Sequence, residues 1–456
     1  MSLSSISPID GRYENATKAL SEVLSEHALM KYRVRVELEW LRYLANSKLE
    51  GIRNISSDEN VFIDEWLESY SLEDSEWIKH IERTTKHDVK AVEYYIREKL
   101  QVSSLIELGE FVHFACTSED INNLAYAMML RDAVKNHWLP AAQDMVNAVS
   151  SIALNTRDLP MMARTHGQPA SPTTLGKELA VFVYRWQRQL KQISHLEYLG
   201  KFAGAVGNFN AHTSAYPDAN WQEIATDFVE NTLGLTFNPL TTQIESHDYI
   251  AELFHATGRF NQIALGFAQD VWQYISVGYF KQKVIAGEVG SSTMPHKVNP
   301  IDFENAEANF GLANATLNHL ASKLQISRLQ RDLSDSSALR NIGVGIAHGM
   351  IALSSLSRGI SKLEVNQAAI YSDLEHEWSL LAEPVQTVMR KYNLKGGYER
   401  MKDLTRGETV TETTMHEFIQ TLEIPQIDKT RLLEMRPETY IGLASSLVDV
   451  ILEDKK

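Results

Sequence analysis

Apolar side chains recur at steps of three and four residues over long stretches of the chain, at about residues 175–193, 253–278 and 342–360. This spacing places them on one face of a helix. No proline interrupts any of the three stretches. Sustained alternation with a period of two is absent, as is a hairpin signal, so we expect little strand. The pattern predicts an all-α protein whose long helices form a bundle.

Breaks in this pattern divide the chain into three predicted parts. The run from Thr117 to Asp120 is typical of a helix start, with a capping threonine and early acids. The last long stripe ends at about Leu363, and prolines and glycines interrupt the shorter helical patterns beyond it. We therefore predict an N-terminal helical domain (1–111), a central long-helix bundle that forms an oligomer core (112–364) and a C-terminal helical domain (365–456).

The apolar stripes are broad for one compact domain to cover. Long helices with broad apolar faces are often buried against another subunit, which favours a homo-oligomer. A monomeric bundle with one buried face per helix is the alternative that the sequence leaves open.

A polar segment, residues 287–305, lies between two of the long helical patterns. Its prolines remove backbone donors, so it is neither a helix interior nor a central strand. Its glycines predict a mobile loop that could close over a substrate. Such crowding of reactive groups favours an active site over a solvated connector. The groups concerned are Ser291, Ser292, His296, Lys297, Asn299 and Glu304.

Other polar clusters lie at the edges of the helical patterns, and each also has a structural explanation. His87 and Asp88 could form a simple hydrogen bond, the Thr117-Ser118 pair could only cap a helix, and His166 could satisfy a turn. Two arginines, 331 and 340, could cover a solvated face. Together the clusters are polar loops at helix ends, which a bundle can bring to one place. They span residues 83–88, 113–123, 164–171 and 328–340.

Composition excludes several classes of protein. A net charge of −15 disfavours a general nucleic-acid or anionic-membrane surface. The one cysteine, Cys116, allows no intrachain disulfide and fits a reducing compartment. We expect neither a signal peptide nor a membrane helix, and hence a cytoplasmic protein. Zinc-protease, paired-cysteine, Walker and serine-hydrolase motifs are absent, so no metal or cofactor is expected. The Gly343-Val-Gly345 run is better explained by close helix packing than by nucleotide binding.

The segment 290–300 resembles the signature of the aspartase/fumarase lyase superfamily, a long and specific motif. The Thr117-Ser118 and Thr165-His166 pairs match the two other shared regions in order and approximate spacing. His296 favours the adenylosuccinate lyase branch, because fumarase and aspartase usually carry glycine there and argininosuccinate lyase glutamine. The muconate-cycloisomerase branch also tends to carry histidine there, but it typically lacks an equivalent of His166. Segments 83–91, 166–170 and 327–336 resemble that branch too. The likeness begins at residue 7 and reaches the C-terminal domain, while 218–237 match no function.

The resemblance implies a C–N lyase that releases fumarate from adenylosuccinate, giving AMP, and from the succinylated carboxamide ribotide of purine synthesis. Members are homotetramers whose active sites take loops from three subunits. The alternatives are another fumarate-releasing lyase, of the argininosuccinate, aspartate or fumarase type, and a silent helical scaffold. The intact serine, lysine, asparagine and histidine of the motifs speak against the scaffold.

The resemblance also implies roles for single residues. Ser291 would be the base, its alkoxide stabilised by Lys297 and loop N–H groups. His166 would be the acid, with Glu304 as an orienting partner. His87 is the competing acid, and the residues alone do not order the two histidines. The remaining substrate contacts would be Arg12, Tyr13, Arg331, Ser336 and Arg340 for the phosphate and ribose, Thr117, Ser118, Lys297 and Asn299 for the succinyl carboxylates, Gln243 near them, and Lys86, His87 and Asp88.

Overall fold

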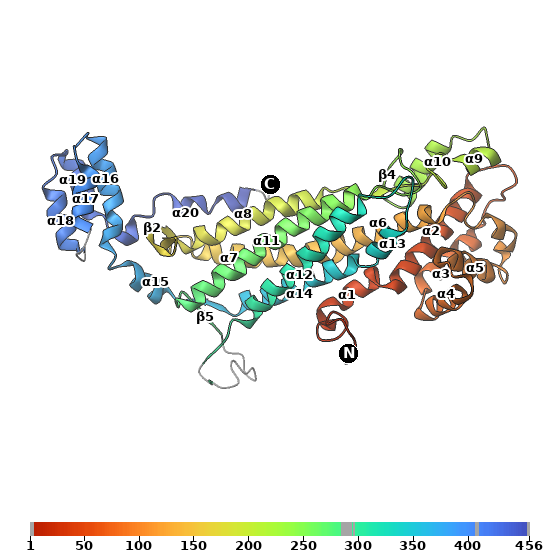
Figure 1. Ribbon diagram of the computed structural model, residues 1–456, viewed down its shortest axis with the longest axis horizontal. Helices are drawn as coiled ribbons and strands as arrows, with labels where there is room; N and C mark the ends of the chain where they lie inside the picture. The colour runs from red at the N-terminus through yellow and green to blue at the C-terminus, as the bar shows by residue number, and fades with distance from the viewer. Residues whose placement is uncertain (1–3, 284–293, 295–296, 406–409, 454–456) are drawn as a thin grey trace. The chain divides into compact units, whose positions relative to one another are not determined.

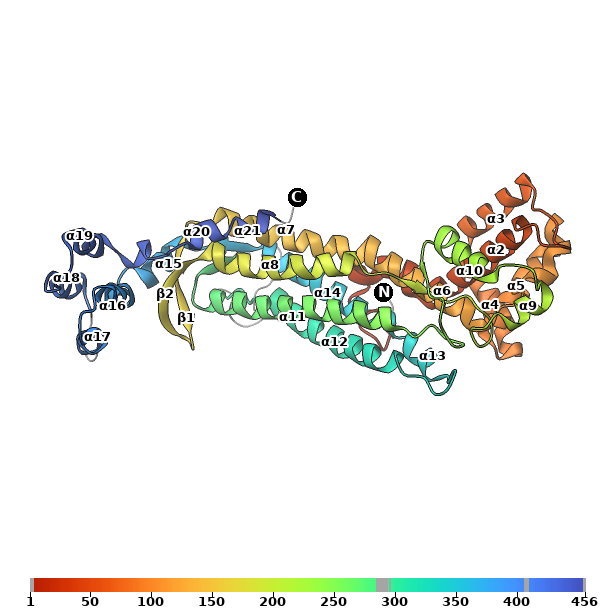
Figure 2. The same cartoon turned by 90° about the horizontal axis from the view of Figure 1, so that it is seen from above.

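The computed structural model describes residues 4–283, 294, 297–405 and 410–453 (Figures 1 and 2). These residues fall into two compact units that interleave along the chain. The first comprises residues 1–142, 189–262 and 309–352, and the second residues 143–188, 263–308 and 353–456. The predicted division at residues 112 and 365 follows chain order, and it stays a prediction.

The three long helices predicted from the apolar stripes are present as α8 (Leu175–Ser194), α11 (Asp248–Ser276) and α14 (Ile342–Ser361). They are accompanied by α7 (Leu139–Asn155) and α12 (Ile301–Leu324), and each of the five contributes residues to both units. Both views show them running alongside one another (Figures 1 and 2). The all-α prediction is therefore confirmed.

Packing between these helices follows the stripes. In the first unit, Trp138 meets Phe260 edge to face at 5.0 Å. A Cβ on Gly345 would lie 2.8 Å from a terminal methyl of Leu317, so a larger residue would displace that side chain where α12 and α14 pack closely. The predicted packing role of this glycine is confirmed. In the second unit, Phe267 of α11 contacts the rings of two α8 residues, Phe182 and Trp186.

Shorter helices complete the first unit. α2 is deeply buried, with Val34, Leu38 and Leu41 all excluded from solvent. The predicted helix start at Thr117 is confirmed, because this residue is the N-cap of α6. The elements are α1 (Glu14–Leu24), α2 (Glu26–Asn46), α3 (Ser57–Ser69), α4 (Leu72–Thr85), α5 (Asp88–Leu100), η1 (Ser104–Phe111), α6 (Ser118–Ala133), η2 (Val134–Trp138), β3 (Leu199–Gly200), α9 (Asn210–Ala215), α10 (Trp221–Asp227), η3 (Phe228–Thr232), β4 (Thr236–Phe237) and α13 (Ser334–Leu339).

The second unit carries a short β-hairpin, which no pattern in the sequence indicated. Strands are otherwise short among the described residues, in line with the expectation of little strand. Strand β1 (Pro160–Thr165) pairs antiparallel with β2 (Gln168–Thr174) around a two-residue turn. His166 and Gly167 form the turn with φ of 53° and 76°, as a type I′ turn requires. The sequence hides the hairpin because His-Gly replaces the usual Asn-Gly, and because prolines and a register shift after Met162 break the alternation.

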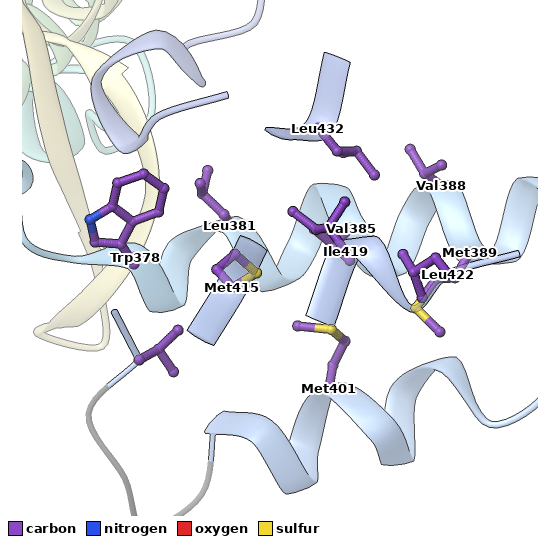
Figure 3. Packing of buried hydrophobic residues seen from close by; sticks show 11 residues of the cluster. Trp378, Leu381, Val385, Val388, Met389, Met401, Met415, Ile419, Leu422 and Leu432 are labelled. Carbon is purple, nitrogen blue, oxygen red and sulfur yellow. The ribbon is translucent and has the colours of Figure 1, made fainter. Parts of the chain in front are cut away.

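The rest of the second unit is a succession of short elements ending in a small helical core. Trp378, Met389 and Met415 are among its buried residues, whose side chains gather between α16, α18 and α19 in Figure 3. The elements are β5 (Phe280–Gln282), β6 (Leu363–Val365), α15 (Gln367–Leu374), η4 (Trp378–Leu381), α16 (Ala382–Lys391), α17 (Gly397–Thr405), α18 (Glu412–Gln420), α19 (Gln426–Glu434), η5 (Pro437–Thr439), α20 (Ala444–Leu447) and α21 (Val450–Glu453). Across the described ranges, no helix is long and apolar enough to cross a membrane.

Candidate active site

Four of the predicted substrate contacts lie in two hydrogen-bonded pairs of the first unit. Asp88, the first residue of α5, accepts from Arg340 at 3.2 Å. Arg331 donates to the Ser336 hydroxyl at 3.0 Å. Each pair is held by a buried partner, Asp88 by Arg33 at 2.8 Å and Arg331 by Glu119 at 2.8 Å. Arg331 therefore does not simply cover a solvated face, because Glu119 holds its mostly buried guanidinium in place. Arg340 stays about half exposed beside Asp88.

The two carboxylates of these pairs have opposite pKa shifts. Burial raises the pKa of Asp88, but Arg33 and, more weakly, Arg340 outweigh that effect, so this pKa lies below its ordinary value. Burial also raises the pKa of Glu119, and here Arg331 only partly offsets it, so the net shift is upward. Asp88 is accordingly the more firmly ionised partner.

His87 caps helix α5 with its side chain. Its Nδ1 accepts from the Lys90 backbone N–H at 3.2 Å, and the ring is about half exposed. Lys86 precedes it in the left-handed region, with φ of 54°. A ring nitrogen that accepts from N–H carries no proton, so the neutral ring bears its proton on Nε2. In this geometry His87 can offer Nε2–H to a ligand as a neutral donor.

Thr117 and Ser118 open helix α6, where backbone N–H groups suit a carboxylate. Asp120 holds this helix end in place, because it is fully buried and accepts a hydrogen bond from the Thr117 N–H at 2.8 Å. Lys201 is equally buried, and its ammonium lies 2.7 Å from the Asp120 carboxylate. The ion pair therefore fixes the position of Thr117 and Ser118, the two predicted substrate contacts.

Two histidines near this anchor, the half-buried His113 and the buried His212, have pKa values shifted in opposite directions. Burial lowers the pKa of His113, but the Glu37 carboxylate at 2.6 Å outweighs it and the net shift is upward. His212 sits among Phe202, Phe209 and Trp221. Its burial lowers its pKa to about 4. His212 is thus a neutral core residue.

The other predicted contacts of the first unit are less tightly held. Arg12 is exposed and its guanidinium lies 5.9 Å from the Tyr13 ring centroid. Gln243 donates to the Ala205 carbonyl at 2.9 Å, which ties it to the loop after Lys201.

His166, the predicted acid, is exposed at the hairpin turn of the second unit. Within the described residues its imidazole has no hydrogen-bond partner. The base of the hairpin is better fixed, because Arg164 contacts Asp373 of α15 at 2.5 Å. Tyr279 donates to the same carboxylate. The hairpin is thus held in place while its turn presents a histidine.

The polar segment is only partly described. Ser291, Ser292 and His296 lie outside the described residues. Lys297 is exposed and Asn299 is half-buried ahead of α12. Glu304, in the first turn of α12, accepts from the Trp272 indole at 3.1 Å. No described hydrogen bond joins it to His166, so its orienting role stays a prediction.

Sequence reasoning missed the buried residues that hold the predicted contacts. Arg33 and Glu37 are spaced so that they share a helix face with Trp40 and Leu44, both fully buried. A charged residue in an apolar stripe is a signal of a buried partner. Asp120 gave no comparable signal, because it lies in a polar stretch of sequence. Lys201 did carry the same signal, since it is the only charged residue in the apolar and glycine-rich run 198–206.

Comparisons with known proteins agree with this architecture. A family model described as "Lyase" matches residues 11–313, and one described as "Adenylosuccinate lyase C-terminal" matches residues 327–441. Among solved structures, a fumarate lyase from Mesorhizobium sp. BNC1 is similar with a TM-score of 0.77 at 18% identity, covering 95% of this chain and 97% of that one. A 3-carboxy-cis,cis-muconate lactonizing enzyme from Pseudomonas putida has a TM-score of 0.74 at 21% identity, covering 96% of both chains. These two likenesses show the shared fold.

The curated relatives are much closer in sequence. The adenylosuccinate lyase of Vibrio cholerae is 53% identical over 449 residues, and that of Escherichia coli K12 is 52% identical over 450 residues. Each alignment covers 98% of this chain and 98% of the relative. The chain therefore belongs to the lyase family, and within it to the adenylosuccinate lyases.

Proposed function

We propose that this protein removes fumarate from adenylosuccinate to give AMP, and from succinylaminoimidazole carboxamide ribotide to give AICAR. The observation that carries the proposal is the identity of 53% to an adenylosuccinate lyase across 98% of both chains. The predicted binding groups of the first unit support it, because arginine and serine donors suit a phosphorylated, dicarboxylate substrate.

The reaction breaks a C–N bond β to a carboxylate. A proton leaves the carbon, the resulting negative charge spreads into the adjacent carboxylate, and the departing nitrogen takes up a proton. The site must therefore supply a base, an acid and donors for the developing charge. We assign these roles to Ser291, His166 and the pair Lys297 and Asn299, with Glu304 orienting the acid.

The geometry of His87 supports His166 as the acid. While Nδ1 of His87 accepts the Lys90 N–H, its ring is neutral, and loss of the remaining Nε2 proton would leave an imidazolate. His166 is exposed and does not cap a helix, so neither of its ring nitrogens is taken up by a backbone N–H among the described residues. We assign His87 to substrate binding, beside Lys86 and Asp88.

The remaining contacts divide by the substrate group that each would hold. Arg331, Ser336 and Arg340 would hold the phosphate side, together with Arg12 and Tyr13. The N-terminus of α6, with Thr117 and Ser118, would hold a succinyl carboxylate, and Gln243 would lie nearby. On binding, Arg331 and Arg340 would each turn from a protein carboxylate to the substrate phosphate, or contact both at once.

We further propose a cytoplasmic homotetramer with active sites shared between subunits. Exposed apolar residues on the long helices support burial against another copy, among them Tyr184 of α8, Trp272 of α11 and Leu312 of α12.

The test is to incubate the purified protein with adenylosuccinate and to measure fumarate and AMP. We expect equimolar products, and a loss of turnover in Ser291→Ala with an unchanged circular dichroism spectrum. Absence of product, or fumarate from argininosuccinate or aspartate instead, would contradict the proposed function.

A further inference from the structure

A bridge of three residues joins the two predicted binding pairs. It runs from Asp88 through Arg33, Asn122 and Glu119 to Arg331. Arg33 of α2 donates from Nη2 to Asp88 and from Nε to the Asn122 side-chain oxygen, both at 2.8 Å. The Asn122 amide nitrogen donates to Glu119 at 2.7 Å, and the same Glu119 oxygen lies 2.8 Å from Arg331.

The bridge is shielded from water at both ends. The side chains of Arg33 and Glu119 are each 4% exposed. Hydrogen bonds to charged groups are stronger in such surroundings, and leaving one unmade is costly. The arrangement therefore holds α2, α6 and the segment before α13 in a fixed relation.

The chemistry at position 122 admits one orientation of one side chain. The amide oxygen faces a guanidinium, which only donates, and the amide nitrogen faces a carboxylate, which only accepts. A flipped amide would set donor against donor and acceptor against acceptor. An ionised aspartate would satisfy Arg33 but repel Glu119. Asparagine is thus the isosteric residue that satisfies both neighbours.

We propose that Arg33 and Asn122 are positioning residues that couple the Asp88 end of the substrate site to its Arg331 end. The inference rests on the proposed function, since it is that function which makes Asp88 and Arg331 substrate contacts. The bridge fixes the separation between Asp88 and Arg331, so that a substrate spanning both meets a preformed site. Neither residue touches the reacting atoms.

The first test substitutes Asn122→Leu, which keeps the shape and removes both hydrogen bonds. We expect KM for adenylosuccinate to rise about tenfold and kcat to change far less, because the lost effect is on binding geometry. Asn261→Leu is the matched control, since Asn261 is a buried first-unit asparagine that donates to Asn314 at 3.1 Å. It should lower the melting temperature comparably and leave KM unchanged.

A second variant keeps the test decisive if Asn122→Leu folds poorly. In Asn122→Asp, a protonated carboxyl can still donate to Glu119, whereas an ionised one cannot. KM should approach the wild-type value at low pH and rise as the pH increases. The charged and titratable groups around position 122 are Arg33 of α2, Asp88 of α5, Glu119 and Tyr126 of α6, Arg331, Asp335 of α13 and Arg340.

The coupling between the Asp88 end and the Arg331 end of the site is measured with the variants Asp88→Asn and Ser336→Ala, singly and together. Their effects on KM should be non-additive in the wild-type background and additive in Asn122→Leu. Additivity in both backgrounds, or an Asn122→Leu enzyme with wild-type KM, would overturn the inference. If the wild-type protein itself released no fumarate, the proposed function would fail instead, so the two failures are distinguishable.

Discussion

The predicted binding residues are held by buried partners, whereas the predicted acid is exposed. In the first unit, Asp88 and Arg331 are each held by a buried, oppositely charged partner. In the second unit, His166 projects from a hairpin turn and is exposed. The difference indicates a rigid binding frame and an acid that is presented outward, as expected for a site completed by another copy of the chain. The predictions below test each half of this comparison.

The largest effect is expected from His166→Asn. Asparagine tolerates the positive φ of this turn, so the hairpin should survive while the acid is lost. Turnover should fall by about 10²–10⁴-fold, the usual contribution of a general acid. Steady-state kinetics and thermal melting check this. His87→Asn, which keeps a capping side chain, should cost less in kcat, and a larger loss there than in His166→Asn would reverse the assignment.

Lys201→Met should give the largest loss of stability. It leaves Asp120 buried without its cation, which costs about 3–5 kcal/mol in comparable pairs. Denaturant unfolding measures the change. Lys177→Met is the control, because Lys177 and Glu178 are each about a third exposed, and such surface pairs contribute about 0–1 kcal/mol. Equal losses in the two variants would contradict the anchoring role of the buried pair.

Arg164→Ala tests whether the base of the hairpin positions its turn. Loss of the contact with Asp373 should lower kcat about tenfold, since small displacements of a catalytic group are costly. The matched control is Arg157→Ala, which breaks a comparably exposed ion pair with Asp449 at 2.8 Å. A similar kcat in both variants would show that the Arg164 contact does not position the acid.

The remaining prediction concerns the pH dependence of stability. The pKa of His212 is lowered to about 4 by burial, below the ordinary 6.5. Between these values the unfolded chain binds a proton that the folded chain does not, so stability falls as the pH drops from about 6.5 towards 4. His212 accounts for at most about 1.4 kcal/mol per pH unit. In His212→Leu this decline should be shallower in melting curves, and an unchanged slope would contradict the assignment.

The sequence was sufficient for the helices of the bundle. Their apolar stripes are long and regular, and burial of Phe260, Phe267 and Ile346 follows them. The hairpin escaped prediction because its turn residues and its three prolines, at positions 160, 169 and 172, are atypical of strands. Its pairing is set by tertiary contacts, among them the one between Arg164 and Asp373.

For the site, motifs located the groups that face a substrate, but not the residues that hold them. Arg33 and Asn122 are 89 positions apart and meet only when α2 packs against α6. Neither residue belongs to a motif of its own. The pattern of a single sequence indicates which face of a helix is buried, but not which residues on two helices meet. The proton on His87 Nε2 likewise follows from one backbone hydrogen bond that no sequence pattern encodes.

The central claim is that the frame around Arg331 and the acid His166 act together in one site built from different copies of the chain. The direct measurement mixes inactive His166→Asn with inactive Arg331→Gln, a change that keeps a donor towards Glu119. If the two contributions come from different subunits, random exchange leaves about a quarter of the sites intact, and activity should recover towards that fraction. Activity equal to the sum of the parents, after co-purification of differently tagged subunits has proved exchange, would contradict the claim.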